Sequence, residues 1–442
     1  MLTIETNADF AVEKEYCFHV LFREMLGTDY RVVWTTEKHY RIRLPNGASV
    51  VIEDRFWGDV SANNYLNVNH LPAFCPSLKY ENRDYAVLYG RPFIQEITEN
   101  DQTTRQCGAD LFASTFFMLT RWEEYVLPDR DAHGRFPAAA SAAVRFGFMD
   151  RPVVNEWADL LFLLLQKAGW QHTRPERRYK LSLSCDVDHP RLWWSAADRL
   201  KTLGGSLFSR GNPDEFKYWL LNYTFGAHDP YDVFDEWLHI FREHHLQVHF
   251  NFLGERKRGS DCYYPVRHPF VRKTMEKLAA QGHFIGFHPS YEAYENAGTF
   301  ERELESLRQV SPVPVQTGRQ HYLRFAAPFT WRTWDAAGMD WDSTLGYSEL
   351  EGFRCGICHD YPVFDFLERK MLRLREKPLI AMDVTLAQYR ELTPEKALES
   401  LLHLKEQVVR HGGEFVFLWH NSSWNTYFWA RWKSVFLQFI ST

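Results

Sequence analysis

The sequence contains no apolar run long enough to cross a membrane, which takes about 18 consecutive apolar residues. Its first residues, MLTIETNADFAVEKEY, carry acids early and lack the basic-then-apolar order of a secretory signal. Its 7 cysteines, an odd number spread widely along the chain, are typical of reduced thiols rather than of a disulfide framework. These absences predict a cytoplasmic protein with no transmembrane segment.

An excess of basic residues is also missing. The net charge is −6, whereas a protein that binds nucleic acid presents a basic face, so we expect no nucleic-acid partner. The composition, 45% hydrophobic and 24% charged, is that of an ordinary globular protein. At 442 residues the chain exceeds one ordinary hydrophobic core, and we expect two domains. Nothing in the sequence predicts an oligomeric state.

One cysteine cluster, CGICH, contains Cys355, Cys358 and His359 and matches the attachment string of c-type haem. That attachment takes place outside the cytoplasm, and the sequence shows no export signal. A zinc site based on two thiolates usually has a second CxxC pair, which is missing here. We therefore expect neither haem nor zinc at these cysteines.

A polar, proline-containing stretch at 167–180 follows the apolar, helix-like run WADLLFLLLQ and marks a domain boundary. We predict a smaller α+β domain over residues 1–176 and a second domain over 177–442. In the first domain the pattern predicts a hairpin around Asn46-Gly47 and a helix over 111–126. This region offers no catalytic constellation, and its role cannot be assigned from the sequence.

The second domain alternates strand-like and helix-like patterns. Val233, Trp237, Ile240 and Phe241 share one face of a predicted helix, and two further helical patterns follow later in the chain. Alternation of this kind favours a parallel sheet, and we predict a (β/α) barrel of about seven parallel strands. The predicted strands are 180–186, 247–255, 283–288, 318–325, 339–344, 378–384 and 413–421; the helices are 231–246, 268–282 and 397–412.

Polar residues fall at the carboxyl ends of these strands. Barrels place their chemistry at that face, so residues far apart in the sequence are expected to converge there. The residues are Asp186, Asp188, His288, Asp342 and His420. Alternation along LSLSCDVD puts Asp186 and Asp188 on the same side of their strand, together with Ser184.

Two carboxylates this close would raise one pKa unless a cation lies between them, which a bound divalent metal would supply. The alternative is a turn-capping pair before Pro190. A single histidine is more often structural than a ligand, but His288 and His420 at two further strand ends together favour a shared site.

From Arg178 to about Asn425 the chain resembles the polysaccharide deacetylase family, carbohydrate esterase family 4. The motifs that carry the resemblance occur in the family's order: LSCDVDHP, QVHFNFLGE, EKLAAQGHFIGFHPS, GRQHYLRF and FLWHN. The first region, in DLFASTFFMLTRWEEY and GRFPAAAS, resembles the domain that precedes this barrel in one bacterial subgroup. The resemblance implies a distorted (β/α) barrel of the polysaccharide deacetylase type.

The resemblance also implies roles for individual residues. Asp186 would be the general base and Asp188 a metal ligand, although Val187 between them leaves these two roles open to exchange. His288 would be a second ligand, and His420 the general acid. Asp342 resembles the acid that orients that histidine.

The third ligand departs from the family pattern, which usually has a second histidine four residues after the first. Glu292 occupies that position here, and His321 in GRQHYLRF is the other candidate. Aligned to the family's Arg-Pro-Pro-Tyr-Gly motif, this stretch gives Arg319, rather than Arg324, as the site arginine and Tyr322 as the tyrosine. His321 then lies on the same strand face as Arg319, and we predict His321 as the ligand. Arg319 would keep the base ionised.

The function implied is removal of N-acetyl groups from a sugar or polysaccharide precursor by a hydrolase that uses a divalent metal, for which we expect Zn²⁺. A backbone N–H near Tyr322 would help to stabilise the oxyanion. The substrate would be an N-acetylated carbohydrate, such as a precursor of a bacterial surface polysaccharide.

Three other functions compete with this one. A glycosidase would need carboxylates on separate strands, and Asp186 and Asp188 share one. An inactive sugar-binding barrel and a metal-dependent hydrolase of a non-sugar C–N bond remain alternatives. An insertion between Pro190 and Pro230 carries Trp193, Trp194 and Trp219, which could stack on sugar rings or pack against one another.

Overall fold

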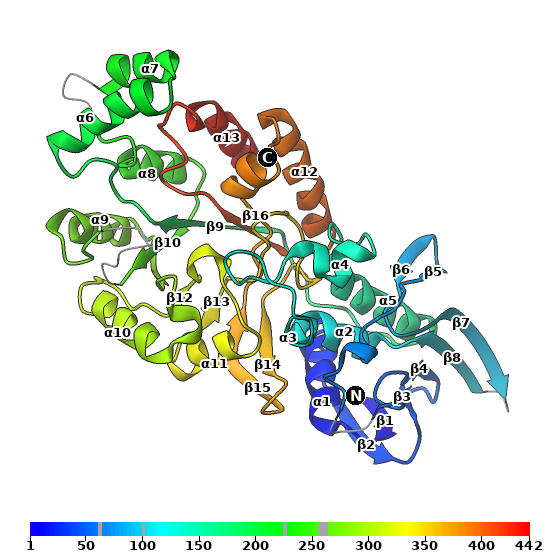
Figure 1. Ribbon diagram of the computed structural model, residues 1–442. Helices are drawn as coiled ribbons and strands as arrows, with labels where there is room; N and C mark the ends of the chain where they lie inside the picture. Colours follow the sequence, from blue (N-terminus) through cyan, green and yellow to red (C-terminus); the bar gives the residue numbers. More distant parts are fainter. Residues whose placement is uncertain (61–63, 100–101, 224–227, 255–263) are drawn as a thin grey trace.

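The computed structural model describes residues 1–60, 64–99, 102–223, 228–254 and 264–442 (Figure 1). The chain forms an α/β protein with two sheets. An N-terminal part is built on a mixed sheet, and the rest of the chain is built on a larger, mostly parallel sheet. Neither part contains, in these ranges, a helix that is both long and apolar enough to span a bilayer.

The N-terminal sheet has six strands in the order β2-β1-β3-β4-β8-β7, with parallel and antiparallel pairings. The hairpin predicted around Asn46-Gly47 is confirmed, since β3 and β4 pair antiparallel across it. The strands are β1 (Leu2–Asn7), β2 (Tyr30–Thr35), β3 (His39–Arg43), β4 (Ser49–Glu53), β7 (Gly90–Glu99) and β8 (Gln102–Ala109), with a separate hairpin of β5 (Ser77–Tyr80) and β6 (Arg83–Ala86).

The helix predicted over 111–126 is present but divided. Arg121 has a φ of 56°, in the left-handed region, and ends one helix before the next begins. Every residue of the first of these helices is buried, so it is a core helix rather than an amphipathic one. The helices of this part are α1 (Ala11–Phe18), α2 (Leu111–Thr120), α3 (Trp122–Val126), α4 (Ala142–Arg145) and α5 (Val153–Lys167).

The larger sheet contains a strand within six of the seven predicted ranges, whereas the range 318–325 is strand only at Gly318 and then turns. Glu255, the last residue of one prediction, lies outside the described residues. The order of the sheet is β14-β15-β13-β12-β11-β10-β9-β17-β16, and only the β14–β15 pairing is antiparallel. The strands are β9 (Lys180–Val187), β10 (Val248–Leu253), β11 (Phe284–His288), β12 (Thr317–Gly318), β13 (Trp341–Asp342), β14 (Tyr361–Asp365), β15 (Lys370–Glu376), β16 (Ala381–Met382) and β17 (Glu414–Leu418).

A closed barrel is not observed. The pairing that would close it, between the strands at the two ends of the sheet, does not occur among the described residues. Two strands that the sequence analysis missed, β14 and β15, form a hairpin, and β15 extends the sheet beyond β13. The (β/α) barrel prediction therefore holds as far as a parallel sheet with intervening helices.

Helices pack against this sheet as the periodicity predicts. α9 packs against β11, α10 against β10 and α12 against β17, and Trp237 and Phe241 on the predicted face of α8 are buried. The helices are α6 (Ala196–Gly204), α7 (Pro213–Tyr223), α8 (Phe234–Glu243), α9 (Pro269–Ala280), α10 (Ala297–Arg308), α11 (Phe329–Ala336), α12 (Pro394–Arg410) and α13 (Lys433–Ser441).

The two parts share one hydrophobic core, which runs from the N-terminal helices into the edge of the large sheet. The hydroxyl of Tyr16 in α1 donates to the carbonyl of Pro362 in β14 over 2.9 Å. Phe116 of α2 packs edge-on against Phe364 of β14 with ring centroids 5.4 Å apart. In Figure 1 the N-terminal helices lie beside β14 and β15. The division at residue 176 stays a prediction.

The tryptophans of the insertion do not form a sugar platform in the described structure. Trp193 and Trp219 are both buried and pack edge to face, with ring centroids 5.9 Å apart. Trp194 is exposed at 36% and contacts the His268 ring edge to face, with centroids 5.0 Å apart. The packing interpretation of these aromatics is therefore favoured. Cys355 and Cys358 are buried free thiols within the core, and Cys262 lies outside the described residues.

Gly318 allows the closest strand approach near the site. A Cβ built on it would lie 1.9 Å from the carbonyl oxygen of Phe287 on the neighbouring strand. We predict that Gly318→Ala lowers the free energy of unfolding by about 1–3 kcal/mol, because backbone atoms must move apart. Gly298→Ala, whose Cβ would meet no atom closer than 3.8 Å, should leave the urea midpoint unchanged or raise it slightly. Equal midpoints for both variants would contradict this prediction.

Candidate metal centre

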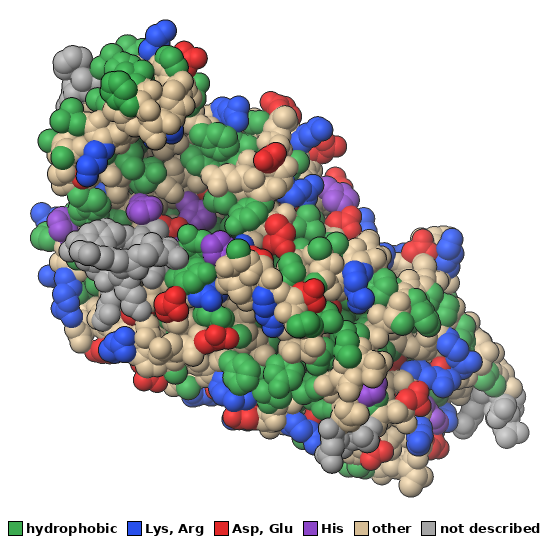
Figure 2. All heavy atoms as spheres, in the orientation of Figure 1, with side chains coloured by type: hydrophobic (Ala, Val, Ile, Leu, Met, Phe, Trp, Pro, Cys, Tyr) green, Lys and Arg blue, Asp and Glu red, His purple; other side chains and the backbone are tan. Residues whose placement is uncertain are grey.

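A pocket of about 560 Å³ opens at the carboxyl ends of the large sheet's strands. Its lining includes four of the five strand-end residues predicted to converge, Asp186, Asp188, His288 and His420, but not Asp342. His321, the predicted third ligand, also lines it. Figure 2 shows histidine side chains gathered on the face in view. Leu323, Met382, Val384 and Leu418 form an apolar side of the same pocket.

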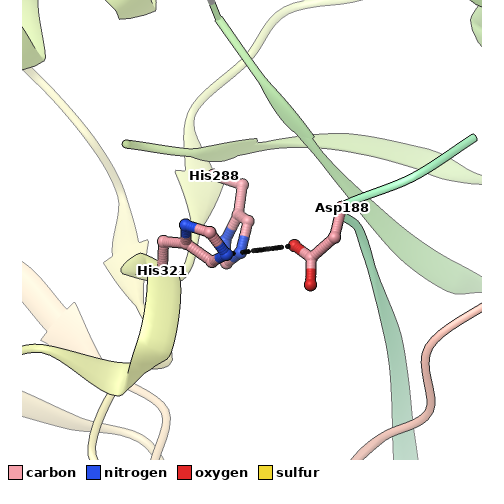
Figure 3. A group of neighbouring side chains, drawn as sticks. All are labelled: Asp188, His288 and His321. Carbon is pink, nitrogen blue, oxygen red and sulfur yellow. Dashed lines mark ion pairs between the residues drawn. The ribbon is translucent and has the colours of Figure 1, made fainter. Parts of the chain in front are cut away.

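Asp188, His288 and His321 point toward one another and could hold a metal ion (Figure 3). Oδ1 of Asp188 lies 3.2 Å from Nε2 of His288 and 3.5 Å from Nε2 of His321. Ligands of a tetrahedral zinc ion, 2.0–2.1 Å from the metal, lie about 3.3 Å from one another. The two distances from Asp188 Oδ1 are thus those expected between ligands of one zinc ion, and all three donor atoms lie within 4.8 Å of one another.

The tautomer of His288 is fixed by the backbone. Its Nδ1 lies 2.7 Å from the carbonyl oxygen of Arg319, and because a carbonyl only accepts, Nδ1 carries a proton. In the neutral ring Nε2 then directs a lone pair at Asp188 Oδ1, a buried oxygen with no hydrogen-bond donor among the described residues. Burial lowers the pKa of His288, but Asp186 and Asp188 raise it more, above its usual value. The space between His288 Nε2 and Asp188 Oδ1 therefore favours a positive charge, which is either a proton on Nε2 or a divalent metal ion held by both atoms.

His321 reaches this cluster from a turn and not from a strand. β12 ends at Gly318, and a 3-10 turn, His321–Leu323, follows it. The prediction that His321 shares a strand face with Arg319 is therefore wrong, although the side chain still arrives at the site. Tyr322 and Leu323 have φ values of 59° and 55°, which non-glycine residues rarely adopt. Glu292, the other candidate ligand, is exposed and lies outside the cluster.

Asp186 has a different environment from Asp188. Its Oδ1 accepts hydrogen bonds from Asn251 Nδ2 at 2.7 Å and from Arg319 Nη1 at 3.0 Å. Burial raises the pKa of Asp186, but the Arg319 guanidinium and the neighbouring histidines bring it below its usual value. The carboxylate is therefore ionised next to the three candidate ligands. Arg324 lies elsewhere, with its Nε donating to the carbonyl of His133 at 2.8 Å.

The carboxylate that orients His420 is Asp383, and the prediction of Asp342 for this role is wrong. Asp383 Oδ1 lies 2.8 Å from His420 Nδ1, and its Oδ2 accepts the His420 backbone N–H at 2.9 Å. Nε2 of His420 faces Asp188 Oδ2 at 3.8 Å. Burial lowers the pKa of His420, but Asp383 and the other two aspartates raise it to about 9. The ring is therefore protonated at neutral pH.

Asp342 lies in the core beside Glu376, its register partner on β15. It accepts a hydrogen bond from the hydroxyl of Thr344. Burial raises the pKa of Asp342 to about 7 and also raises that of Glu376. This acid pair does not line the pocket.

Three further residues of the site were not predicted from the sequence. Asp383 follows β16 directly, so the rule that polar residues end strands could have found it. Gln320 is buried against the pocket, and neither of its amide atoms has a partner in the described part of the chain. Arg135 reaches the pocket from the N-terminal part; its stretch, GRFPAAAS, was noted in the sequence, but its position at the site was not predicted.

Comparisons with known proteins match the two parts of the chain separately. A family of unknown function, DUF7033, matches residues 2–169. No curated protein matches the chain.

Solved structures resemble the chain in fold. A Mycobacterium smegmatis protein described as a polysaccharide deacetylase is 19% identical, with a TM-score of 0.38 over 61% of this chain and 85% of that one. A peptidoglycan N-acetylglucosamine deacetylase is 11% identical, with a TM-score of 0.31 over 60% and 84% of the two chains. A family 4 carbohydrate esterase pseudoenzyme from Bacillus anthracis is 8% identical, with a TM-score of 0.31 over 60% and 61%. Scores this low leave the site's chemistry to be judged from its own residues.

The geometry predicts which residues bind a metal. His288→Ala and His321→Ala should each weaken zinc binding roughly 100-fold or more, because each removes one of three donors. Glu292→Gln is the matched control and should retain the zinc stoichiometry of the wild type. Elemental analysis after dialysis, followed by competition with a chelator, measures both quantities. Retention of zinc by His321→Ala together with its loss from Glu292→Gln would assign the ligand to Glu292.

Proposed function

We propose that the protein is a metal-dependent hydrolase that removes N-acetyl groups from a sugar or polysaccharide precursor. One observation carries the proposal: His288 Nε2 and Oδ1 of Asp188 face each other across 3.2 Å, and both would serve as ligands of a divalent cation. A base and an acid from separate strands flank that position. Hydrolysis of an amide needs both, because the attacking water must lose a proton and the departing amine must gain one.

Asp186 is the base in this proposal. Arg319 and Asn251 hold its carboxylate ionised and fixed, and only Val187 separates it from the ligand Asp188. Its free oxygen can take a proton from a water bound beside Asp188. The contacts of the two aspartates support this assignment over the exchanged one, since Asp188 faces the imidazoles and Asp186 faces the guanidinium.

His420 is the acid. Its Nδ1–H is committed to Asp383, so Nε2 delivers the second proton of the charged ring toward the pocket. A bound divalent cation, for which we propose Zn²⁺, would acidify the water and polarise the acyl carbonyl. A bond forms between the water oxygen and the acyl carbon, the C–N bond breaks, and acetate and a free amine leave.

The pocket suits a small acyl group. Leu323, Met382 and Leu418 belong to a small hydrophobic cluster that reaches the pocket wall and could receive a methyl group. The rest of the substrate is less constrained. Tyr322 and Tyr389 line the pocket, whereas the buried tryptophans Trp193 and Trp219 do not line it and cannot stack on a sugar ring there. This observation favours a second candidate function, hydrolysis of a non-sugar amide at the same site.

Acetate release from N-acetylglucosamine oligosaccharides tests the proposed function. The zinc-loaded protein should release acetate and expose amines without generating new reducing ends. Asp186→Asn should lower kcat roughly 100-fold or more, since it removes the proton acceptor, while zinc stays bound. New reducing ends would indicate a glycosidase. Binding of the oligosaccharide without any acetate would indicate an inactive sugar-binding protein, and turnover of simple N-acetyl amines alone would support the second candidate.

The two buried acids provide a sharper test of the proton donor. Asp383→Asn should lower kcat roughly 100-fold, because an amide cannot stabilise the charged ring of His420. Asp342→Asn is the matched control, an equally buried acid outside the pocket, and should leave kcat near the wild-type value. Steady-state kinetics of both variants at one pH measures the difference. The reverse ranking would restore Asp342 as the orienting acid.

A further inference from the structure

The turn that carries His321 has little support from its own strand. β12 is only two residues long, and after it Tyr322 and Leu323 adopt left-handed backbone conformations. Such conformations cost about 1–3 kcal/mol each and persist only where surrounding groups hold them. Groups outside β12 must therefore hold this turn.

A loop of the N-terminal part, residues 127–137, supplies them. Nη1 of Arg135 donates to the carbonyl oxygen of Tyr322 at 3.0 Å, and Nη2 lies 3.4 Å from the hydroxyl of Tyr389, another residue that lines the pocket. The His133 and Tyr322 rings contact each other with centroids 4.8 Å apart. Arg135 therefore links two residues of the site from a different part of the chain.

The turn also holds the loop. Arg324, at the end of the turn, donates through Nε to the carbonyl of His133 at 2.8 Å and through Nη1 to that of Tyr291 at 2.6 Å. Its guanidinium lies 3.9 Å from the ring centroid of Tyr291 and 3.8 Å from that of Tyr294. The two arginines thus point in opposite directions across one interface, each donating to a backbone carbonyl on the other side.

The loop is rigid enough to act as a support. Asp131 Oδ1 accepts the backbone N–H groups of His133 and Arg135 at 2.8 and 2.9 Å, and its Oδ2 accepts Arg135 Nε at 2.7 Å. The Arg135 side chain is only 8% exposed. With Nε fixed on Asp131, the planar guanidinium has its Nη1 aimed at the carbonyl of Tyr322.

We propose that the N-terminal part completes the site: Arg135 is a positioning residue that holds the Tyr322 backbone and thereby keeps His321 in place to bind the metal. The metal-binding half of this statement rests on the function proposed above, whereas the support of the turn does not. The N-terminal part would accordingly act within the site, and not only as a separate module beside it.

Hydrogen–deuterium exchange on the metal-free protein tests the support itself. Arg135→Ala should speed exchange of residues 319–325 about tenfold or more, and guanidinium added at millimolar concentration should slow it again by filling the vacated position. Arg151→Ala is the matched control, because Arg151 pairs with Glu156 and with the carbonyl of Asp84 inside the N-terminal part. It should leave exchange at 319–325 unchanged. Equal exchange rates at residues 319–325 in the wild type, Arg135→Ala and Arg151→Ala would overturn the proposal.

Zinc affinity separates this proposal from the proposed function. Arg135→Ala should bind zinc about tenfold more weakly than Arg151→Ala at a similar unfolding midpoint. If Arg135→Ala does not fold, Arg135→Lys takes its place, because an ammonium keeps the charge but cannot span Asp131 and Tyr322 together. If the wild type binds no zinc and Arg135→Ala still exchanges faster at residues 319–325, the metal site is refuted. The support of the turn by Arg135 would then stand on its own. Wild-type exchange and zinc affinity in both Arg135 variants would refute the support.

Discussion

The site depends on one buried cation, Arg319. Its guanidinium donates to the carbonyl of Ser343 beyond β13 at 2.7 Å and to Ser184 and Asp186 of β9 at 2.9 and 3.0 Å, while its own carbonyl accepts His288 Nδ1 at the end of β11. A buried guanidinium without partners costs several kcal/mol, so these strand ends must converge for the fold to be stable. The same contacts set the chemistry. They keep Asp186 ionised and leave the Nε2 lone pair of His288 facing Asp188.

The sequence allowed most strands to be predicted, but not whether the sheet that they form closes into a barrel. Six of the seven predicted strands are present, because a buried strand between helices has a clear pattern of its own, whereas the range 318–325 is strand only at Gly318. That pattern does not say which neighbour a strand will pair with. The missed hairpin of β14 and β15 takes the position beside β13, and β14 is buried on its other side by α2 of the N-terminal part. The contact between α2 and β14, which are more than two hundred residues apart, therefore determines how the sheet ends. Local periodicity cannot predict such a contact.

The acid that orients His420 was misassigned from the sequence. Asp342 ends β13 and Asp383 follows β16, so the rule that places polar residues at strand ends fits both equally well. Sheet order separates them, since β16 is the direct neighbour of β17, which leads into His420, whereas β13 lies five strands from β17. The residues predicted correctly to converge, Asp186, Asp188 and His288, come from β9 and β11, which flank β10. β16 and β17 are likewise consecutive in the chain and adjacent in the sheet, so chain order could also have identified Asp383; the family resemblance pointed to Asp342 instead.

His321, the third candidate ligand, needs residues outside its own segment to hold it in place. Glu292, four residues after His288, is the position where the resemblance implied a ligand, but it is exposed and precedes the short 3-10 helix Ala293–Glu295. His321 lies instead on a turn whose next two residues are left-handed, and such a turn needs partners outside its own segment. Arg135 and Arg324 provide them across the interface between the two parts of the chain. The packing of the N-terminal part against this turn is thus what allows a turn residue, His321, to take the position of a ligand.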